Sequence, residues 1–265
     1  MPELPEVETA RRFAEAHLAG RVIRSVAVAD DRIVFSGVAP RTFAHRLGGR
    51  RPVAFRRRGK HLWIELDTPP HPAFHLGMTG HFHLYEDPAD RPRFWKCEWR
   101  LDDGARFAFV NVRRLGRIRL LADPEHEPPI AGLGPDPLLD PWPGFDFATA
   151  LRARKAPVKA ALLDQSFVAG IGNWIADEVL YQAGLDPRRR GTDLRVDECL
   201  RLHRALRRVI RHALAVEADD TRFPRTWLFH HRWGKNHGVR TARGDAIRFD
   251  TIGGRTTAWV PARQR

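Results

Sequence analysis

The spacing of apolar residues changes partway along the chain, and this change limits the folds that the chain can adopt. From Val22 to about Leu121, apolar residues come in short alternating runs such as residues 61–66, which is the pattern of half-buried strands. Residues 123–145 are rich in Pro, Gly and Asp and show little periodicity. From about residue 148 the spacing becomes helical. The pattern predicts an antiparallel β-sandwich or flattened barrel, then a linker and a helical part.

The charge is unevenly distributed along the chain. The formal net charge is +13, and residues 151–265 account for +11 of it, with 23 Lys and Arg against 12 Asp and Glu. This asymmetry indicates a polyanion-binding domain in the second half. The two cysteines, Cys97 and Cys199, are far apart and form no CxxC motif, so the sequence suggests no disulfide framework and no cysteine zinc site. No stretch is apolar enough to span a membrane and no signal peptide is present, so we expect a cytoplasmic, nucleoid-associated protein.

The first residues combine a helix start with a chemically usable terminus. Apolar residues recur at helical spacing over residues 5–19, and Gly20 ends the pattern. Removal of Met1 would leave Pro2 with a free secondary amine, and terminal amines have a reference pKa of roughly 7.7–8.0. Such an amine can attack a sugar C1′ and form an iminium, with Glu3 beside it as proton donor or acceptor. A Pro in the first helical turn, followed by acids near the positive end of the helix, is the alternative interpretation, and spacing leaves both open.

The opening Pro-Glu-Leu-Pro-Glu-Val-Glu-Thr resembles that of the formamidopyrimidine-DNA glycosylases. Three further segments are similar in the same order, so the resemblance covers residue 2 to about residue 264. In that family the N-terminal Pro is the nucleophile and the following Glu is the catalytic acid, which implies these roles for Pro2 and Glu3. The resemblance implies a bifunctional DNA glycosylase and AP lyase of base excision repair. Its expected substrates are oxidised bases (ring-opened purines and, as a candidate, 8-oxoguanine), and abasic sites are nicked by β,δ-elimination.

Three positions in the first domain match family segments. Lys60 ends a basic run before a strand; composition alone fits a solvated loop, whereas the family Lys contacts phosphate beside the lesion and assists elimination. Met78 lies in His-Leu-Gly-Met-Thr-Gly, and a lone Met is usually core filler, but the family Met fills the gap left by the extruded base. Arg113 lies in Asn-Val-Arg-Arg-Leu-Gly, where the family Arg reads the orphaned base. Leu115 replaces the family's wedging aromatic, and Phe94 replaces a DNA-contacting His.

The helical part contains the segment Val-Ala-Gly-Ile-Gly-Asn followed by Ala-Asp-Glu, which resembles the family's helix–two-turn–helix. In the family the Asn contacts phosphate, so Asn173 is expected to do the same. Lys155 and Lys159 match basic positions near DNA, and Glu6 and Glu178 are expected to support the active site. A further Arg-rich helix from about Asp197 to Val216 is expected to present most of its arginines to solvent.

The C-terminal segment departs from the commonest family pattern. Relatives often end in a four-Cys zinc hairpin, but the expected Cys places here are Val260 and Arg263, with the earlier pair near Arg240 and Arg243. Without thiolates, no zinc of that kind can bind. The run Ile-Gly-Gly-Arg255-Thr-Thr-Ala is similar to the zinc-less hairpin of some members, which implies that Arg255 holds the phosphate beside the flipped nucleotide. The side chains expected to replace the metal by apolar packing are Trp227, Phe229, Trp233, Ile247, Phe249 and Trp259.

These observations predict an α+β protein with an N-terminal helix and antiparallel β-sandwich, a helical helix–two-turn–helix domain and a C-terminal zinc-less β-hairpin finger. The expected boundaries are 1–122, a linker at 123–147, 148–222 and 223–265. We expect no zinc and no other cofactor, damaged double-stranded DNA as the partner, no membrane association and a monomer. Two alternatives remain open: a non-catalytic protein that binds lesions or abasic sites, if Met1 is retained, and an RNA-binding helix–turn–helix module.

Overall fold

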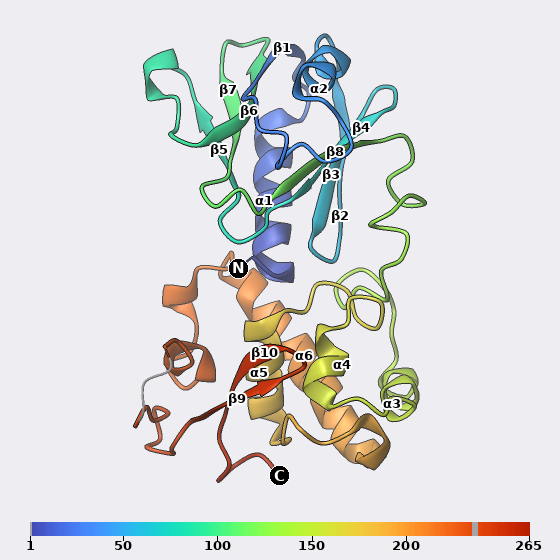
Figure 1. The fold of residues 1–265 in the computed structure, drawn as a ribbon, viewed down its shortest axis with the longest axis vertical. Helices are drawn as coiled ribbons and strands as arrows, with labels where there is room; N and C mark the ends of the chain where they lie inside the picture. The colour runs from blue at the N-terminus through green and yellow to red at the C-terminus, as the bar shows by residue number, and fades with distance from the viewer. Residues whose placement is uncertain (1, 235–237) are drawn as a thin grey trace. The chain divides into compact units, whose positions relative to one another are not determined.

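The computed structural model describes residues 2–234 and 238–265, which form two structural units (Figure 1). The first unit contains Pro2 and Glu6–Gly132, and the second contains Glu3–Pro5 and Leu133–Arg265. The division therefore lies inside the segment interpreted as a linker. Met1, whose removal the terminal-amine hypothesis requires, lies outside the described residues.

The first unit contains two four-stranded antiparallel sheets, with strand orders β1-β6-β7-β5 and β2-β3-β4-β8. Alternating sequence runs form these strands, because successive side chains of a strand face opposite sides of the sheet. The strands are β1 Ile23–Val28, β2 Pro52–Arg58, β3 His61–Leu66, β4 His71–His75, β5 His81–Tyr85, β6 Trp95–Leu101, β7 Arg106–Val110 and β8 Arg117–Leu121.

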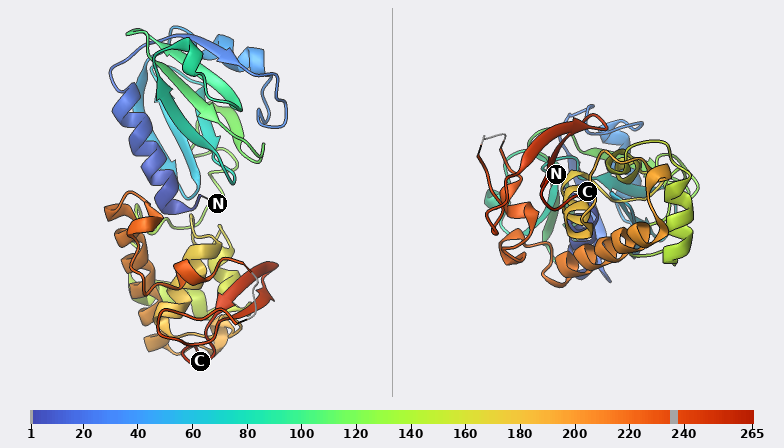
Figure 2. Two further views of the ribbon diagram at one scale, coloured as in Figure 1. Left: turned by 90° about the vertical axis from the view of Figure 1, so that its left-hand side faces the viewer. Right: turned by 90° about the horizontal axis from the view of Figure 1, so that it is seen from below.

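The two sheets share one apolar core. Phe74 of β4 contacts Phe82 and Phe109 of the other sheet, with ring centroids 5.2 and 5.4 Å apart. Helix α1 (Leu4–Leu18) buries its apolar face in the same core, as the helical spacing of residues 5–19 predicted. A short helix that the alternating pattern did not predict, α2 (Pro40–Leu47), also packs there through Phe43. The left view of Figure 2 shows α1 lying along the sheets.

Four α-helices of the second unit, as far as its residues are described, surround a separate core. These are α3 Gly144–Arg152, α4 Val158–Leu163, α5 Asn173–Ala183 and α6 Val196–Ala215. The helical pattern from residue 148 to 163 corresponds to two helices, α3 and α4, and not to one. Pro157 separates them, because a proline disfavours a helical backbone at the residue before it. Short 3₁₀ turns complete the described elements: η1 Pro88–Asp90, η2 Gly191–Asp193, η3 Asp220–Arg222 and η4 Leu228–His231. The arginines of α6 are exposed, as predicted: Arg201, Arg204, Arg207, Arg208 and Arg211.

The chain ends in the predicted β-hairpin, formed by β9 (Arg248–Ile252) and β10 (Arg255–Trp259). The turn residues Gly253 and Gly254 have φ values of 59° and 72°, which is the left-handed backbone that a two-residue hairpin turn requires. A β-carbon on Gly253 would lie 2.9 Å from Cβ of Ala160, so the hairpin tip lies against α4. The α+β fold class is confirmed.

The packing around the hairpin differs in part from the expected set. Ile247 and Trp259 are buried, but Trp233 is 54% exposed, so its inclusion was wrong. Trp227 and Phe229 belong to the core of the helices. The hairpin's own apolar cluster is Leu228, Ile247, Ala258 and Val260, flanked by Tyr181, Val239 and Phe249. Val260, at one expected Cys place, is fully buried, and Arg263, at the other, forms an ion pair with Asp245.

Candidate functional site

The side chain of Glu3 lies at the N-terminus of α5 in the second unit. Its carboxylate accepts hydrogen bonds from the backbone N–H groups of Gly172 (2.7 Å), Trp174 (2.8 Å) and Ile175 (3.2 Å). The backbone N–H of Leu4 donates to the carbonyl of Gly170 at 3.0 Å. A helix N-terminus has unpaired N–H groups and a positive dipole end, which suits a carboxylate. The start of the chain is therefore attached to a segment about 170 residues away in sequence.

Two glycines make this attachment possible. A β-carbon on Gly172 would lie 2.3 Å from Cδ of Glu3, and one on Gly170 would lie 2.8 Å from Cβ of Leu4. Gly170 also has φ of +89°, which side chains rarely adopt. The Gly-Ile-Gly spacing in the sequence is thus explained by the close approach of the N-terminal residues, a function that sequence analysis did not assign to it.

Asn173 connects the same helix end to the hairpin. Its Nδ2 donates to the carbonyl of Thr256 at 2.9 Å, next to Arg255, whose side chain is exposed. Since an amide nitrogen has two N–H groups, this bond leaves the predicted phosphate contact of Asn173 chemically possible. Within the second unit the structure therefore brings together Glu3, Asn173 and the hairpin residue Arg255. Lys155 is exposed in the segment before α4.

Lys159 occupies a different environment from the predicted one. Its side chain has no exposed surface, and Nζ pairs with Asp177 and donates to the carbonyl of Asn173 at 3.1 Å. Burial lowers the pKa of this ammonium, and the Asp177 carboxylate opposes the shift. Asp177 also accepts from Arg232 and from the backbone N–H of Ala258. A direct DNA contact by Lys159 is contradicted, and its position is that of a structural cation between α4, α5 and the hairpin.

Two loops of the first unit are joined by a buried amide. Asn111 has no exposed surface; its Nδ2 donates to the carbonyl of Leu76 at 3.1 Å and its Oδ1 accepts from the N–H of Gly116 at 3.0 Å. A β-carbon on Gly77 would lie 2.4 Å from the carbonyl carbon of Leu115. The segments 76–80 and 111–116 therefore pack backbone against backbone.

The tips of these loops expose the side chains expected to enter DNA. Met78 is 36% exposed and Leu115 is 45% exposed, although both are apolar. The N–H of Arg113 donates to the hydroxyl of Thr79 at 3.3 Å, which places the predicted base-reading arginine beside the Met78 loop. Within the first unit the structure thus brings Met78, Arg113 and Leu115 together.

A carboxylate fixes the second arginine of this segment. Arg114 donates to both oxygens of Asp31, at 2.9 and 3.0 Å, and Lys96 donates to the same group. Burial alone would raise the pKa of the Asp31 carboxyl, but these two cations lower it to about 2. Arg114 therefore anchors the loop, and the predicted reading of the orphaned base stays assigned to Arg113.

Lys60 lies in the two-residue turn between β2 and β3, after Gly59 with φ of +57°. The turn is attached to α1, because Arg57 donates to Glu8 at 3.1 Å and to the carbonyl of Gly59 at 3.0 Å.

Two histidines, His61 and His75, form a cross-strand pair beside Lys60 and are uncharged near neutral pH. Burial lowers the pKa of His61 to about 3 and that of His75 to about 4, with Lys60 and Arg119 adding to both shifts. The positive charge at this corner therefore belongs to the lysine and arginine side chains, which suits a phosphate contact.

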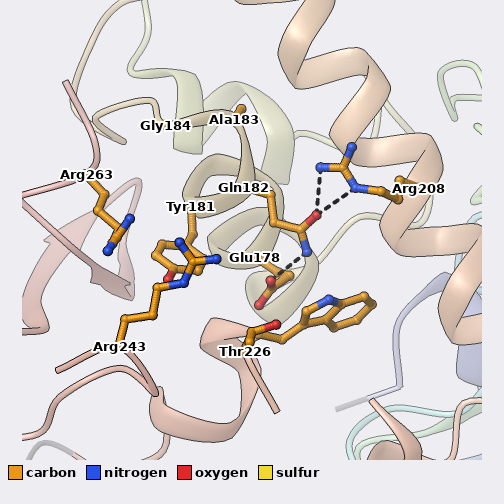
Figure 3. A pocket seen from close by; sticks show the side chains of 10 residues that line it. Glu178, Tyr181, Gln182, Ala183, Gly184, Arg208, Thr226, Arg243 and Arg263 are labelled. Atoms are coloured by element: carbon orange, nitrogen blue, oxygen red, sulfur yellow. Dashed lines mark hydrogen bonds between the residues drawn. The ribbon is translucent and has the colours of Figure 1, made fainter. Parts of the chain in front are cut away.

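Glu178 lines a pocket in the second unit that does not include Glu3 or Asn173 (Figure 3). Gln182 donates to one of its oxygens at 2.7 Å and the N–H of Phe229 to the other at 2.9 Å, while Arg208 donates to Gln182. Burial raises the pKa of Glu178 to about 7 against these hydrogen bonds. Glu178 therefore supports the segment that precedes the hairpin, through its bond from Phe229. Glu6 is in the first turn of α1.

The described residues contain no group of three His, Cys, Asp or Glu side chains arranged to hold a metal. Both cysteines of the sequence are buried outside the hairpin, and neither is close in sequence to Val260 or Arg263. The thiolate set of a zinc hairpin is therefore absent. Among the described residues, no helix has the length and apolar character needed to cross a bilayer.

The comparisons with protein families, with individual proteins and with solved structures agree with one another. Residues 1–118 match the formamidopyrimidine-DNA glycosylase N-terminal domain, and residues 133–225 match the H2TH domain of the same proteins. A formamidopyrimidine-DNA glycosylase of Arabidopsis thaliana is 42% identical over the whole chain and 71% of its own length. One from Laribacter hongkongensis is 32% identical over the full length of both. The crystal structure of the Lactococcus lactis enzyme bound non-covalently to DNA with an AP site covers 99% of both chains, with 26% identity and a TM-score of 0.87.

Proposed function

The chain belongs to the formamidopyrimidine-DNA glycosylase family, and from this premise we propose that it uses Pro2 as the nucleophile of a combined glycosylase and AP lyase reaction. It is a DNA glycosylase of base excision repair, and damaged DNA is its partner. The observation that most supports the proposed roles is the position of Glu3 at the N-terminus of α5, beside Asn173 and next to Pro2 in the chain.

The proposed chemistry begins with a bond from the Pro2 nitrogen to C1′ of the flipped deoxyribose. The glycosidic bond breaks, and the base leaves with its electron pair and with the proton that the Pro2 nitrogen loses. Glu3 supplies a proton to O4′ as the C1′–O4′ bond breaks and the iminium forms. The resulting iminium makes the C2′ proton acidic, so its loss breaks the C3′–O bond, and a second elimination breaks the C5′–O bond. Lys60 and Arg255 hold the adjacent phosphates and assist these steps.

The residues of the first unit prepare the substrate in this proposal. Extruding a nucleotide costs a few kcal/mol of unstacking, and an apolar side chain in the vacancy offsets part of that cost. Met78 and Leu115 are exposed at the loop tips and fit this purpose. Arg113 reads the orphaned base, and Lys155 and Asn173 contact phosphates. No metal or organic cofactor enters the reaction, because the iminium is the electron sink.

The proposed substrate class rests on the DNA that related proteins bind. One related structure is bound to DNA containing ring-opened guanine and another to DNA containing carbocyclic 8-oxoguanine. We propose that this chain excises ring-opened purines, and that Leu115, without an aromatic ring, gives it a weaker opposite-base preference than relatives with one. We also expect a monomeric, cytoplasmic protein associated with the nucleoid. Excision rates on duplexes with each lesion and each opposite base test the first two expectations.

Borohydride trapping on an abasic duplex tests the nucleophile. The protein with a free Pro2 should form a covalent adduct, and Pro2→Gly should slow its formation sharply. A matched control has a Gly-Ser extension before Pro2, which keeps the side chain but converts its nitrogen into an amide. Trapping by the extended protein would contradict the proposal, and binding without any adduct would favour the alternative of a non-catalytic abasic-site binder. Family membership argues against the RNA-binding alternative, which would require preference for RNA over an abasic duplex.

A further inference from the structure

Phe94 is an exposed aromatic residue with a backbone that such residues rarely adopt. It precedes β6, is 42% exposed and has φ of +64°. A turn that needed only this backbone would be better served by Gly or Asn, because a bulky side chain at positive φ is strained. Strained positions of this kind concentrate at functional sites, where the rest of the structure holds them in place.

The register of the sheet places Phe94 at the same end as the two loops. Trp95, the first residue of β6, pairs with Val110 at the end of β7, and Val110 also pairs with His81 at the start of β5. Loop 111–116 therefore leaves the sheet, and loop 76–80 enters it, at the edge where Phe94 lies. The backbone N–H of Asn111 donates to the carbonyl of Phe94 at 3.1 Å, so the residue whose side chain joins the loops also holds Phe94 through its backbone.

The chemistry around the ring matches a nucleic-acid surface. The guanidinium of Arg93 lies over one face of the ring at 4.7 Å from its centroid, and Phe94 as a whole remains exposed. Val112 is 47% exposed in the adjacent loop, and Arg113 is exposed beyond it. Apolar and aromatic surface interleaved with arginines favours unstacked bases next to phosphates, because bases stack on rings and phosphates pair with guanidinium groups.

We propose that Phe94 is an additional DNA-stacking residue, whose ring packs on a base of the damaged duplex while Arg93 contacts the neighbouring phosphate. The proposal rests on the proposed function, since it assigns a further contact to the same DNA surface. It gives the chain an aromatic contact that Leu115 lacks, from a different loop. Stacking tolerates any base, so Phe94 adds affinity for a distorted duplex without adding sequence preference.

Binding to a duplex with a tetrahydrofuran abasic analogue tests this inference without requiring catalysis. Phe94→Asn tolerates the positive φ and removes the ring, and Phe94→Trp keeps a ring. Phe145→Asn is the matched control, because Phe145 is an exposed aromatic (68%) of α3 in the second unit. Affinity is measured by fluorescence anisotropy over a series of salt concentrations, and thermal unfolding checks that each variant is folded.

We expect Phe94→Asn to weaken binding about 5- to 150-fold, the range for loss of one stacked base, with an unchanged salt slope because no phosphate contact is lost. Phe94→Trp should bind within a few-fold of the unmodified protein, and Phe145→Asn should bind as tightly as it does. Binding by folded Phe94→Asn within two-fold of the unmodified protein would overturn the inference alone. A reduced salt slope would also overturn it, because the contact would then be ionic. Failure of the unmodified protein to bind this duplex would overturn the proposed function as well.

Discussion

The N–H of Gly172 donates to Oε2 of Glu3 at 2.7 Å, and there is no room for a side chain between the two residues. Gly172→Ala would place a β-carbon 2.3 Å from Cδ of Glu3, so the carboxylate must move. Displacing a reacting group by about 1 Å costs roughly 100-fold in rate. We expect single-turnover excision to fall by about that factor, with affinity for the abasic-analogue duplex changed only a few-fold.

Gly132→Ala is the control for this substitution, because no atom lies within 4 Å of a β-carbon at that position. It should leave excision unchanged. An unchanged excision rate in Gly172→Ala would mean that the position of Glu3 does not matter for the reaction.

The buried amide of Asn111 predicts a stability effect in the first unit. Asn111→Ala removes two hydrogen bonds and leaves the buried N–H of Gly116 without this partner, while the carbonyl of Leu76 keeps its bond from the N–H of Gly80 at 2.8 Å. An unsatisfied buried N–H costs about 1–3 kcal/mol, so urea unfolding should show a loss of about that size. Asn111→Asp would place a buried carboxylate against the carbonyl of Leu76, and should lose at least as much stability. Equal stability of Asn111→Ala and the unmodified protein would contradict the bridging role.

The raised pKa of Glu178 predicts a pH-dependent stability. Burial moves this pKa from 4.5 to about 7, so the folded state holds the proton more tightly than the unfolded state. The stability from this group is fully present below about pH 4.5 and is lost as pH rises through about 7, a loss of about 3 kcal/mol. Glu178→Gln does not titrate, so its stability relative to the unmodified protein should improve between pH 5 and pH 8. Parallel pH profiles in urea unfolding would contradict this prediction.

The hairpin is expected to be stable without metal. Val260, at an expected Cys place, is fully buried, so Val260→Ala should lower stability by about 2 kcal/mol through lost burial and a cavity. Val53→Ala is the control, because Val53 is 59% exposed on β2 and its truncation should cost little. EDTA should leave both thermal unfolding and excision unchanged. Loss of activity in EDTA that zinc restores would show that a metal holds the hairpin.

Local sequence patterns predicted the elements of the fold but not every boundary. The periodicities located α1, the strand-rich region from residue 22 to about residue 121, and α6, because each depends on spacing within a few residues. The helix α2 and the break between α3 and α4 escaped this reasoning. The segments around Met78 and Arg113 were recognised by the similarity of their residues to family motifs. The structure adds the physical reason why the two segments pair, which is the side-chain amide of Asn111.

Contacts between distant segments could not be read from the sequence. Nothing local indicates that Lys159 is enclosed with Asp177 and Arg232, and its match to a basic family position implied a DNA contact instead. Trp233 is the larger apolar side chain, yet it is exposed while Val260 is buried. The acceptor role of Glu3 at α5 joins residues 169 apart. Each of these depends on tertiary packing, which spacing along the chain does not encode.

The most direct test of the central claim is the mass of the peptide that holds the borohydride-trapped DNA sugar. After trapping on an abasic duplex and proteolysis, we predict that the reduced adduct is found on the N-terminal peptide, with Pro2 as its first residue and the sugar on its nitrogen. An adduct located on Lys60 or another lysine, with the Pro2 peptide unmodified, would contradict the account.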